Sequence, residues 1–207
     1  LFGSNNKMNI KVIKEEKYKL VFIIDKITPA VANTIRRYAM NYVPVLAIEE
    51  VEIERNSSGL YDELLAHRMG LVPIKTDLKS YNFMRDCKCD GKGCEHCQLI
   101  FTLKIKGPCT VYSKDLESAD PKCIPAYENI PLVILLKGQE VKTEAKAVLG
   151  EGKDHAKFSP GLVYYRGYPE LVVTRESNVK DALSKIPDSV LVQKGNLLEI
   201  KDILKWN

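Results

Sequence analysis

The alternation of apolar and polar residues predicts a β-hairpin at the start of the chain. Met8, Ile10 and Val12 alternate with polar neighbours, which is the pattern of a half-buried strand. Residues 18–25 form a continuous apolar run rich in β-branched side chains, which favours a second strand. Only residues 15–17 separate the two segments, so we expect the strands to pair with each other.

A capped helix is predicted next. Thr28 can accept a hydrogen bond at the helix N-terminus, and Pro29 occupies the first turn, where a missing N–H costs nothing. Four apolar residues then recur at helical spacing: Val31, Ile35, Tyr38 and Tyr42. We expect this face of the helix to pack on the protein core. Pro44 ends the helix and leads into an extended strand over residues 45–55.

The rest of the chain predicts mostly strands. Residues 56–59 form a turn and the first candidate domain boundary, and a short helix over residues 60–69 stops at Gly70. Strands are expected at residues 101–105, 110–113, 132–136, 141–149, 162–165 and 170–174. A last helix at 179–186 and a hairpin at 190–200 follow. The pattern predicts an α+β fold, mostly antiparallel, with an insertion between residue 56 and about residue 168.

Composition adds few constraints. The 207 residues suffice for one large or two small domains, and 45% hydrophobic with 28% charged residues is usual for a soluble globular protein. The net charge of +4 is too small to indicate a nucleic-acid binder by itself. No apolar run approaches the roughly 20 residues that span a bilayer, so we expect no membrane partner. Residues 1–7 are interpreted as an addition made for expression, with a natural disordered N-terminus as the alternative.

Four of the six cysteines form the strongest chemical motif. Cys87, Cys89, Cys94 and Cys97 have the spacing C-x-C-x4-C-x2-C, which lets two thiolate pairs surround one ion tetrahedrally. Gly91 and Gly93 supply the backbone freedom that such a loop needs. Four free thiols, an iron–sulfur centre, or His96 as a substitute ligand are the alternatives. We expect one structural zinc ion with no open coordination position.

The other candidate residues carry weaker signals. Six cysteines without a secretory signal indicate a reducing compartment, so we expect a cytoplasmic protein, with Cys109 and Cys123 as small buried residues. His67 follows Glu63 at a spacing that loosely resembles a metalloprotease, but the helix holds no second histidine. The loop around His155 lacks the P-loop pattern. We therefore predict no catalytic residues.

A pair of arginines in the first helix has two interpretations. Arg36 and Arg37 are either solvated surface charges or anchors of a protein interface, where arginine is enriched. Asn33, one turn earlier, and the small residues around them fit the second interpretation.

These motifs, in this order, resemble the α-type assembly subunits of RNA polymerase. The matching segments are Asn-Thr-Ile-Arg-Arg (33–37), Val-Pro-Val-Leu-Ala-Ile (43–48), Asn-Ser-Ser (56–58), residues 62–73 and residues 152–160. The last two are similar to the archaeal and eukaryotic branch, above all to the archaeal D subunits, the counterparts of the third-largest subunit of eukaryotic RNA polymerase II. The resemblance runs from about Met8 to Tyr168.

The resemblance implies a discontinuous dimerisation domain. Residues 8–55 would form its first part, residues 56–168 an inserted domain with the cysteine loop 87–97, and residues 169–207 the return. It also implies a non-catalytic scaffold that pairs with the small subunit L, docks subunits N and P and the large B-type subunit, and makes no base-specific DNA contact. The interface residues it implies are Asn33, Arg36, Arg37, His67, Arg68, Lys153, His155 and Lys157.

Two features depart from the family pattern. Many archaeal D subunits carry a ferredoxin-like domain with iron–sulfur clusters, and residues 179–200 resemble a degenerate half of it. Ile186-Pro187 stands where a cluster version has Cys-Pro, and no cysteine follows Cys123, so we expect no iron–sulfur cluster. The chain also stops at Trp206-Asn207, before the strand and helix that complete the family dimer, and we expect it to be truncated.

An independent zinc-loop module that binds RNA or DNA is the alternative function. Such a module needs a basic face studded with aromatic residues. Here 31 lysines and arginines are scattered among 27 acidic residues, which disfavours it.

Overall fold

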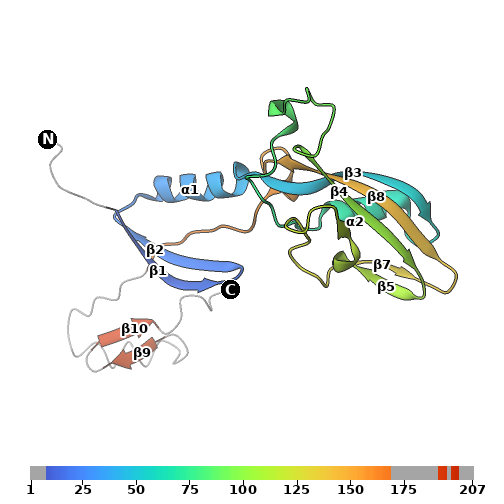
Figure 1. Ribbon diagram of the computed structural model, residues 1–207. Coiled ribbons are helices and arrows are strands. Elements are labelled where there is room, and N and C mark those ends of the chain that lie inside the picture. The colour runs from blue at the N-terminus through green and yellow to red at the C-terminus, as the bar shows by residue number, and fades with distance from the viewer. Residues whose placement is uncertain (1–7, 169–190, 195–196, 201–207) are drawn as a thin grey trace. The chain divides into compact units, whose positions relative to one another are not determined.

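The computed structural model describes residues 8–168, 191–194 and 197–200. The chain divides into two compact units, one formed by Lys26–Tyr165 and the other by the segments on either side of it (Figure 1). Each unit is described by itself.

The unit formed by the two terminal segments, which we call the first unit, contains two antiparallel hairpins among its described residues. β1 (Asn9–Glu16) pairs with β2 (Lys19–Asp25), which confirms the predicted N-terminal hairpin, and a bulge interrupts the register between Val12 and Lys14. β9 (Leu191–Lys194) pairs with β10 (Leu197–Ile200), as the sequence predicted. The expected strand at 170–174 and helix at 179–186 lie outside the described residues.

The second unit is built on a four-stranded antiparallel sheet in the order β3–β8–β4–β6. Its strands are β3 (Val45–Asn56), β8 (Glu140–Gly150), β4 (Gln98–Lys106) and β6 (Glu117–Ser118). Alternate residues of β8 are buried, so the period of two correctly predicted a strand there. β3 pairs with β8 over most of its length, and the expected domain boundary at residue 56 therefore falls at the end of a strand of this sheet.

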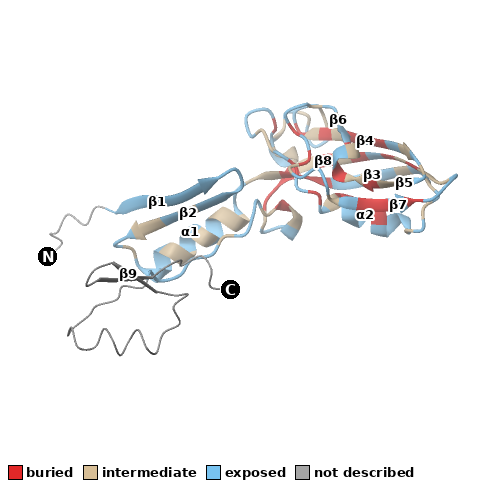
Figure 2. Cartoon of the chain, turned by 90° about the horizontal axis from the view of Figure 1, so that it is seen from below, coloured by how far each residue is buried: buried red, intermediate tan, exposed pale blue. Residues whose placement is uncertain are grey.

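The core of this unit lies between the sheet, α2 and a second small sheet. α2 (Asp62–Gly70) buries Leu65 and Met69 completely, each with 0% exposure. β5 (Cys109–Tyr112) and β7 (Pro131–Leu135) form the antiparallel pair, which contributes Val111 and Leu132 to the same core cluster. Figure 2 shows the buried positions gathered in these elements. The described residues of this unit also form three short 3-10 turns: η1 (Met84–Asp86), η2 (Ser113–Asp115) and η3 (Ala156–Phe158).

Opposite charges stabilise the solvent face of the sheet. Lys146 on β8 contacts Glu52 at 2.6 Å and Glu50 at 3.7 Å, and Lys142 pairs with Glu54. Such cross-strand pairs of opposite charge favour the observed register, although solvent screens each of them. The alternation of apolar and charged residues thus fixes which face of each strand points inward.

α1 (Pro29–Asn41) begins as predicted but packs differently. The Thr28 hydroxyl accepts a hydrogen bond from the Val31 amide at 3.4 Å, with Pro29 in the first position. The expectation that Val31, Ile35, Tyr38 and Tyr42 face the core is wrong: each is between 39% and 61% exposed, and α1 buries no residue. The periodicity correctly identified an apolar face, but no described residue of its own unit buries it.

The strand predicted at residues 162–165 is also wrong. These residues form no regular secondary structure, and Leu162 and Tyr164 are exposed. A β-strand needs a hydrogen-bonded neighbour, and the described residues provide none for this segment. Among the described helices, none has the length and apolar character needed to cross a bilayer.

Candidate metal centre and subunit interfaces

The cysteine loop is held between a 3-10 turn and a strand. Cys87 directly follows η1, and Cys97 directly precedes β4. Cys97 is fully buried, whereas Cys87, Cys89 and Cys94 are half-buried. Both ends of the loop are therefore anchored to the core, and its central residues project from it.

The four sulfur atoms converge on one point. All lie within 4.8 Å of one another, with Cys87–Cys94 at 3.5 Å, Cys89–Cys97 at 3.6 Å and Cys94–Cys97 at 3.7 Å. Four thiolates placed about 2.3 Å from a tetrahedral zinc ion would be about 3.8 Å apart. The four cysteines can therefore hold a single metal ion without a large rearrangement.

The loop backbone adopts conformations that favour glycine. Gly91 and Gly93 have φ values of 76° and 84°, and Asp90 between the thiol pairs has φ 51°. Left-handed residues reverse the chain between the pairs, as the two glycines predicted. The Cys94 amide donates a hydrogen bond to the Cys97 sulfur at 3.2 Å, which would stabilise a thiolate there.

The free thiols differ in acidity because their surroundings differ. A hydrogen bond from the Cys87 thiol lowers the pKa of Cys89 to about 7. Burial raises the pKa of Cys97 to about 12. A cysteine must be deprotonated to bind a metal ion. The positive charge of a bound cation would therefore have to compensate the negative charge of the buried Cys97 thiolate.

The other metal-ligand candidates lie outside this cluster. His96 is exposed, and the described group of converging ligands comprises the four cysteines alone. Cys123 is fully buried, and the half-buried Cys109 directs its sulfur at the Lys106 carbonyl oxygen, 3.7 Å away.

The polar interface candidates of α1 share one side of the helix. Arg36 donates from Nε to the Asn33 Oδ1 at 3.0 Å, and its Nη1 lies 3.8 Å from the sulfur of Met40. Arg37 is exposed. Because residues three and four apart share a helix face, these side chains lie away from the apolar stripe.

The candidates of residues 153–157 are partly engaged within the chain. Lys157 donates to the Ile48 carbonyl oxygen at 3.0 Å and pairs with Glu49, so its side chain is largely buried. Lys153 pairs with Glu151 at 2.6 Å. His155 is exposed, although its Nδ1 accepts a hydrogen bond from the Lys157 amide at 3.1 Å. Of the three, His155 is the one most open to a partner.

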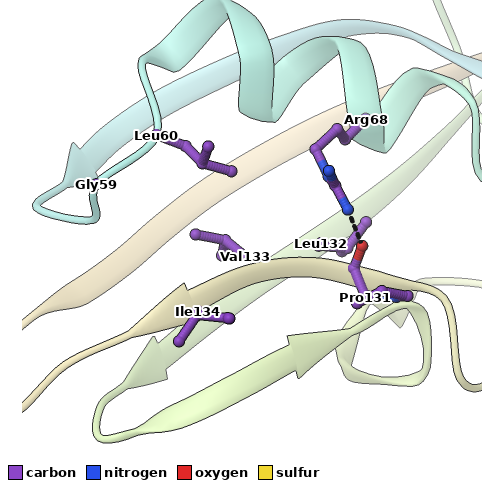
Figure 3. Close-up of a pocket in the computed structure, with 7 residues that line it drawn as sticks. All are labelled: Gly59, Leu60, Arg68, Pro131, Leu132, Val133 and Ile134. Atoms are coloured by element: carbon purple, nitrogen blue, oxygen red, sulfur yellow. Dashed lines mark hydrogen bonds between the residues drawn. The ribbon is translucent and has the colours of Figure 1, made fainter.

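One of the two candidates on α2, Arg68, borders an apolar groove. His67 and Arg68 are both exposed, and Arg68 donates from Nη2 to the Pro131 carbonyl oxygen at 2.5 Å (Figure 3). The groove has a volume of about 440 Å³ and is lined by Gly59, Leu60, Arg68, Pro131, Leu132, Val133 and Ile134. Arg68 is its single titratable side chain, so the groove offers no acid–base pair.

Comparison with known proteins decides between the candidate functions. Residues 51–161 match the family described as the RNA polymerase Rpb3/RpoA insert domain. The chain is 40% identical over 197 residues to DNA-directed RNA polymerase subunit Rpo3 of Archaeoglobus fulgidus, covering 94% of this chain and 75% of that protein. The Methanosphaera stadtmanae Rpo3 is 39% identical, with 95% and 75% covered, and the Pyrococcus horikoshii Rpo3 is 36% identical, with 86% and 67% covered.

The chain belongs to the Rpo3 family of archaeal RNA polymerase subunits. The resemblance found in the sequence is thereby confirmed, and with it the function as an RNA polymerase subunit. An independent nucleic-acid-binding module is not favoured. The Rpo3 insert-domain match covers most of the second unit, including the cysteine loop.

Sequence reasoning missed a buried carboxylate that lies near two cations. Glu151 is buried and lies between Arg85 and Lys153, and no spacing motif marks these residues. Only the proximity of Glu151 to Gly152 and Lys153, which lie in a matched family segment, could have drawn attention to it.

Proposed function

We propose that this Rpo3-family chain is a non-catalytic assembly subunit that pairs with the small polymerase subunit L. The observation that carries the proposal is the exposed apolar stripe of α1. Four apolar side chains at helical spacing cost free energy when they face water, so a stripe of this kind marks a surface for another protein.

Two aromatic residues make this stripe suited to tight binding. Tyr38 and Tyr42 lie one turn apart, with ring centroids 4.9 Å from each other. Tyrosine is enriched among the residues that dominate interface energies. The dimerisation domain is proposed to be discontinuous, with residues 8–55 and 169–207 contributing to it, and residues 56–168 inserted.

The opposite face of α1 is proposed to contact the large B-type subunit. Asn33, Arg36 and Arg37 present hydrogen-bond donors there, and His155 is proposed to join them. Subunits N and P would dock on the same assembled platform, where His67 and Arg68 on α2 are further proposed contacts. Lys153 and Lys157 would support this surface mainly by fixing the loop that carries His155.

The cysteine loop is proposed to hold one structural zinc ion. Cys87, Cys89, Cys94 and Cys97 would supply all four ligands, which leaves no position for a substrate. When bound, the ion would cross-link the two ends of the loop. We propose no iron–sulfur cluster, and we interpret residues 179–200 as a degenerate ferredoxin-like segment. The proposed location is the cytoplasm, without membrane association or base-specific DNA contact.

Co-expression with the small α-like subunit tests the proposed function. We expect the two chains to co-purify as a heterodimer through size-exclusion chromatography, because each supplies the apolar surface that the other needs. A stable, folded monomer that ignores subunit L at micromolar concentrations would contradict the proposal.

A further inference from the structure

A buried carboxylate lies at the end of the central strand β8. Glu151 is 9% exposed, and its Oε2 is 2.6 Å from Lys153 Nζ and 3.9 Å from Arg85 Nη2. The contact with Glu151 raises the pKa of Lys153. A buried carboxylate is tolerated when cations compensate it, and here the two cations come from different segments.

One of these segments secures the end of α1. The Lys153 amide donates to the Asn41 carbonyl oxygen at 3.1 Å, and its ammonium group lies 5.4 Å from the centre of the Tyr42 ring. Gly152 packs so closely on the Met40 carbonyl oxygen that any side chain would collide with it. Residues 151–153 therefore hold the C-terminal turn of α1, where the apolar stripe ends.

The other segment leads into the cysteine loop. Arg85 lies in η1, two residues before Cys87, and its guanidinium stacks on the Phe83 ring at 4.4 Å. The Cys87 amide donates to the Met84 carbonyl oxygen at 3.4 Å, and the Gln98 side chain contacts the Met84 sulfur at 4.0 Å. The turn that carries Arg85 is thus fastened to both ends of the loop.

We propose that Glu151 is a positioning residue that couples the cysteine loop to the C-terminal turn of α1. A metal ion in the loop fixes η1 and keeps Arg85 beside Glu151. With this second cation in place, Glu151 and Lys153 hold residues 40–42 in order. The coupling deepens the proposed function, since it rests on metal binding by the loop and links that binding to the helix that meets subunit L.

The proposal predicts that the metal changes the dynamics of a helix it does not touch. Amide hydrogen exchange at residues 40–42, measured by mass spectrometry on the purified chain with Zn²⁺ bound and after chelation, reads this directly. Arg85→Met cuts the link while it leaves the Glu151–Lys153 pair, and Glu151→Gln removes the carboxylate charge. Glu140→Gln is the matched control, because Glu140 lies at the other end of β8 and pairs with Arg55 at 2.6 Å and Lys106 at 3.6 Å.

We expect chelation to accelerate exchange at residues 40–42 about five-fold in the unmodified chain and in Glu140→Gln, the lower end of typical coupling between sites. Arg85→Met and Glu151→Gln should bind zinc and show no such acceleration. Equal acceleration in Arg85→Met and the unmodified chain would overturn the proposal, as would unchanged exchange in a chain that has bound and then lost zinc. Elemental analysis of the same samples separates these outcomes from failure of the metal site itself, in which no zinc binds and the coupling falls with it.

Discussion

The two α-helices in the described part of the chain differ in how they pack. α2 has nine residues and buries Leu65 and Met69 completely against the sheet, whereas α1 has thirteen residues and buries none. Yet α1 shows the clearer apolar face, with Val31, Ile35 and Tyr38 at helical spacing. The stronger sequence pattern therefore belongs to the helix that buries no residue within its own unit.

The contrast separates two uses of an apolar face. A helix as short as α2 is marginal by itself, and packing in the core supplies its stability. The exposed stripe of α1 contributes nothing comparable to the stability of this chain and is free to bury its area against another subunit. Hydrophobic periodicity thus identifies the apolar face of a helix, but not what buries that face.

The cysteine loop differs from both helices, since neither core packing nor a partner subunit explains its conformation. Cys94→Ser removes one of four ligands, and structural zinc in small loops contributes on the order of 10 kcal/mol to local folding. We expect the unmodified chain to contain about one zinc ion by elemental analysis and the variant to lose it. Cys109→Ser, in a half-buried cysteine apart from the cluster, should keep the metal. Equal zinc content in the two variants would refute the site.

Truncation of the α2 core side chain should have the next largest effect. Leu65→Ala leaves a cavity in a fully buried position and should lower the free energy of unfolding by about 3 kcal/mol in urea titrations. The neighbouring Leu64 is 51% exposed, so Leu64→Ala should lower the free energy of unfolding by less than about 0.5 kcal/mol. Ile35→Ala in α1 should resemble the Leu64 variant in the isolated chain. A loss as large as that of Leu65→Ala would mean that α1 packs within the chain after all.

Truncation of a side chain in the apolar stripe of α1 should weaken binding of the proposed partner. Tyr38→Ala removes the most exposed aromatic side chain of the stripe and should weaken the complex with subunit L by about 2 kcal/mol, roughly thirty-fold in Kd by calorimetry. Tyr61→Ala is the matched control, because Tyr61 is 78% exposed but lies beside α2. If both variants bound subunit L equally well, the stripe would not be the interface.

The smallest predicted effect is a pH dependence of the free energy of unfolding that arises from Tyr81 in the core of the second unit. Tyr81 is buried, and burial together with its 3.2 Å hydrogen bond to Asp120 raises its pKa above the ordinary value of about 10. The unfolded chain therefore ionises this phenol first, and the stability it contributes is present below about pH 10 and lost as pH rises further.

Replacement of this tyrosine tests the sign. Tyr81→Phe should lower the free energy of unfolding by about 1 kcal/mol near pH 8, and the difference should shrink near pH 11. Tyr164→Phe, at an exposed position, should follow the unmodified chain at both pH values. A difference that grows with pH would contradict the assigned direction of the pKa shift.

Much of the fold was predictable because local signals determine it. Thr28 and Pro29 marked the start of α1, and the period of two in β8 outweighed its helix-favouring residues. The strand at 162–165 failed because a short apolar run alone does not provide a neighbouring strand. The pairing of β3 with β8 joins residues about ninety positions apart, which no local pattern can specify.

The candidate metal centre was more accessible to sequence reasoning than its surroundings. Cysteine spacing over eleven residues predicted the convergence of four sulfur atoms, because a short loop has few ways to fold round one ion. The position of Glu151 between Arg85 and Lys153 was not predictable, since it depends on a tertiary contact between two segments far apart in the sequence. The burial of Lys157 against Ile48 was unpredictable for the same reason.

Side-chain footprinting of the tyrosines tests the central claim most directly. Hydroxyl radicals would be generated in the free chain and in its complex with subunit L, and modification of Tyr38, Tyr42, Tyr61 and Tyr164 would be quantified by mass spectrometry. All four are exposed in the chain. We predict that Tyr38 and Tyr42 react in the free chain and are protected in the complex, while Tyr61 and Tyr164 react alike in both. Protection of Tyr38 and Tyr42 in the free chain, or equal reactivity with subunit L bound, would contradict the claim that α1 keeps its apolar face for another subunit.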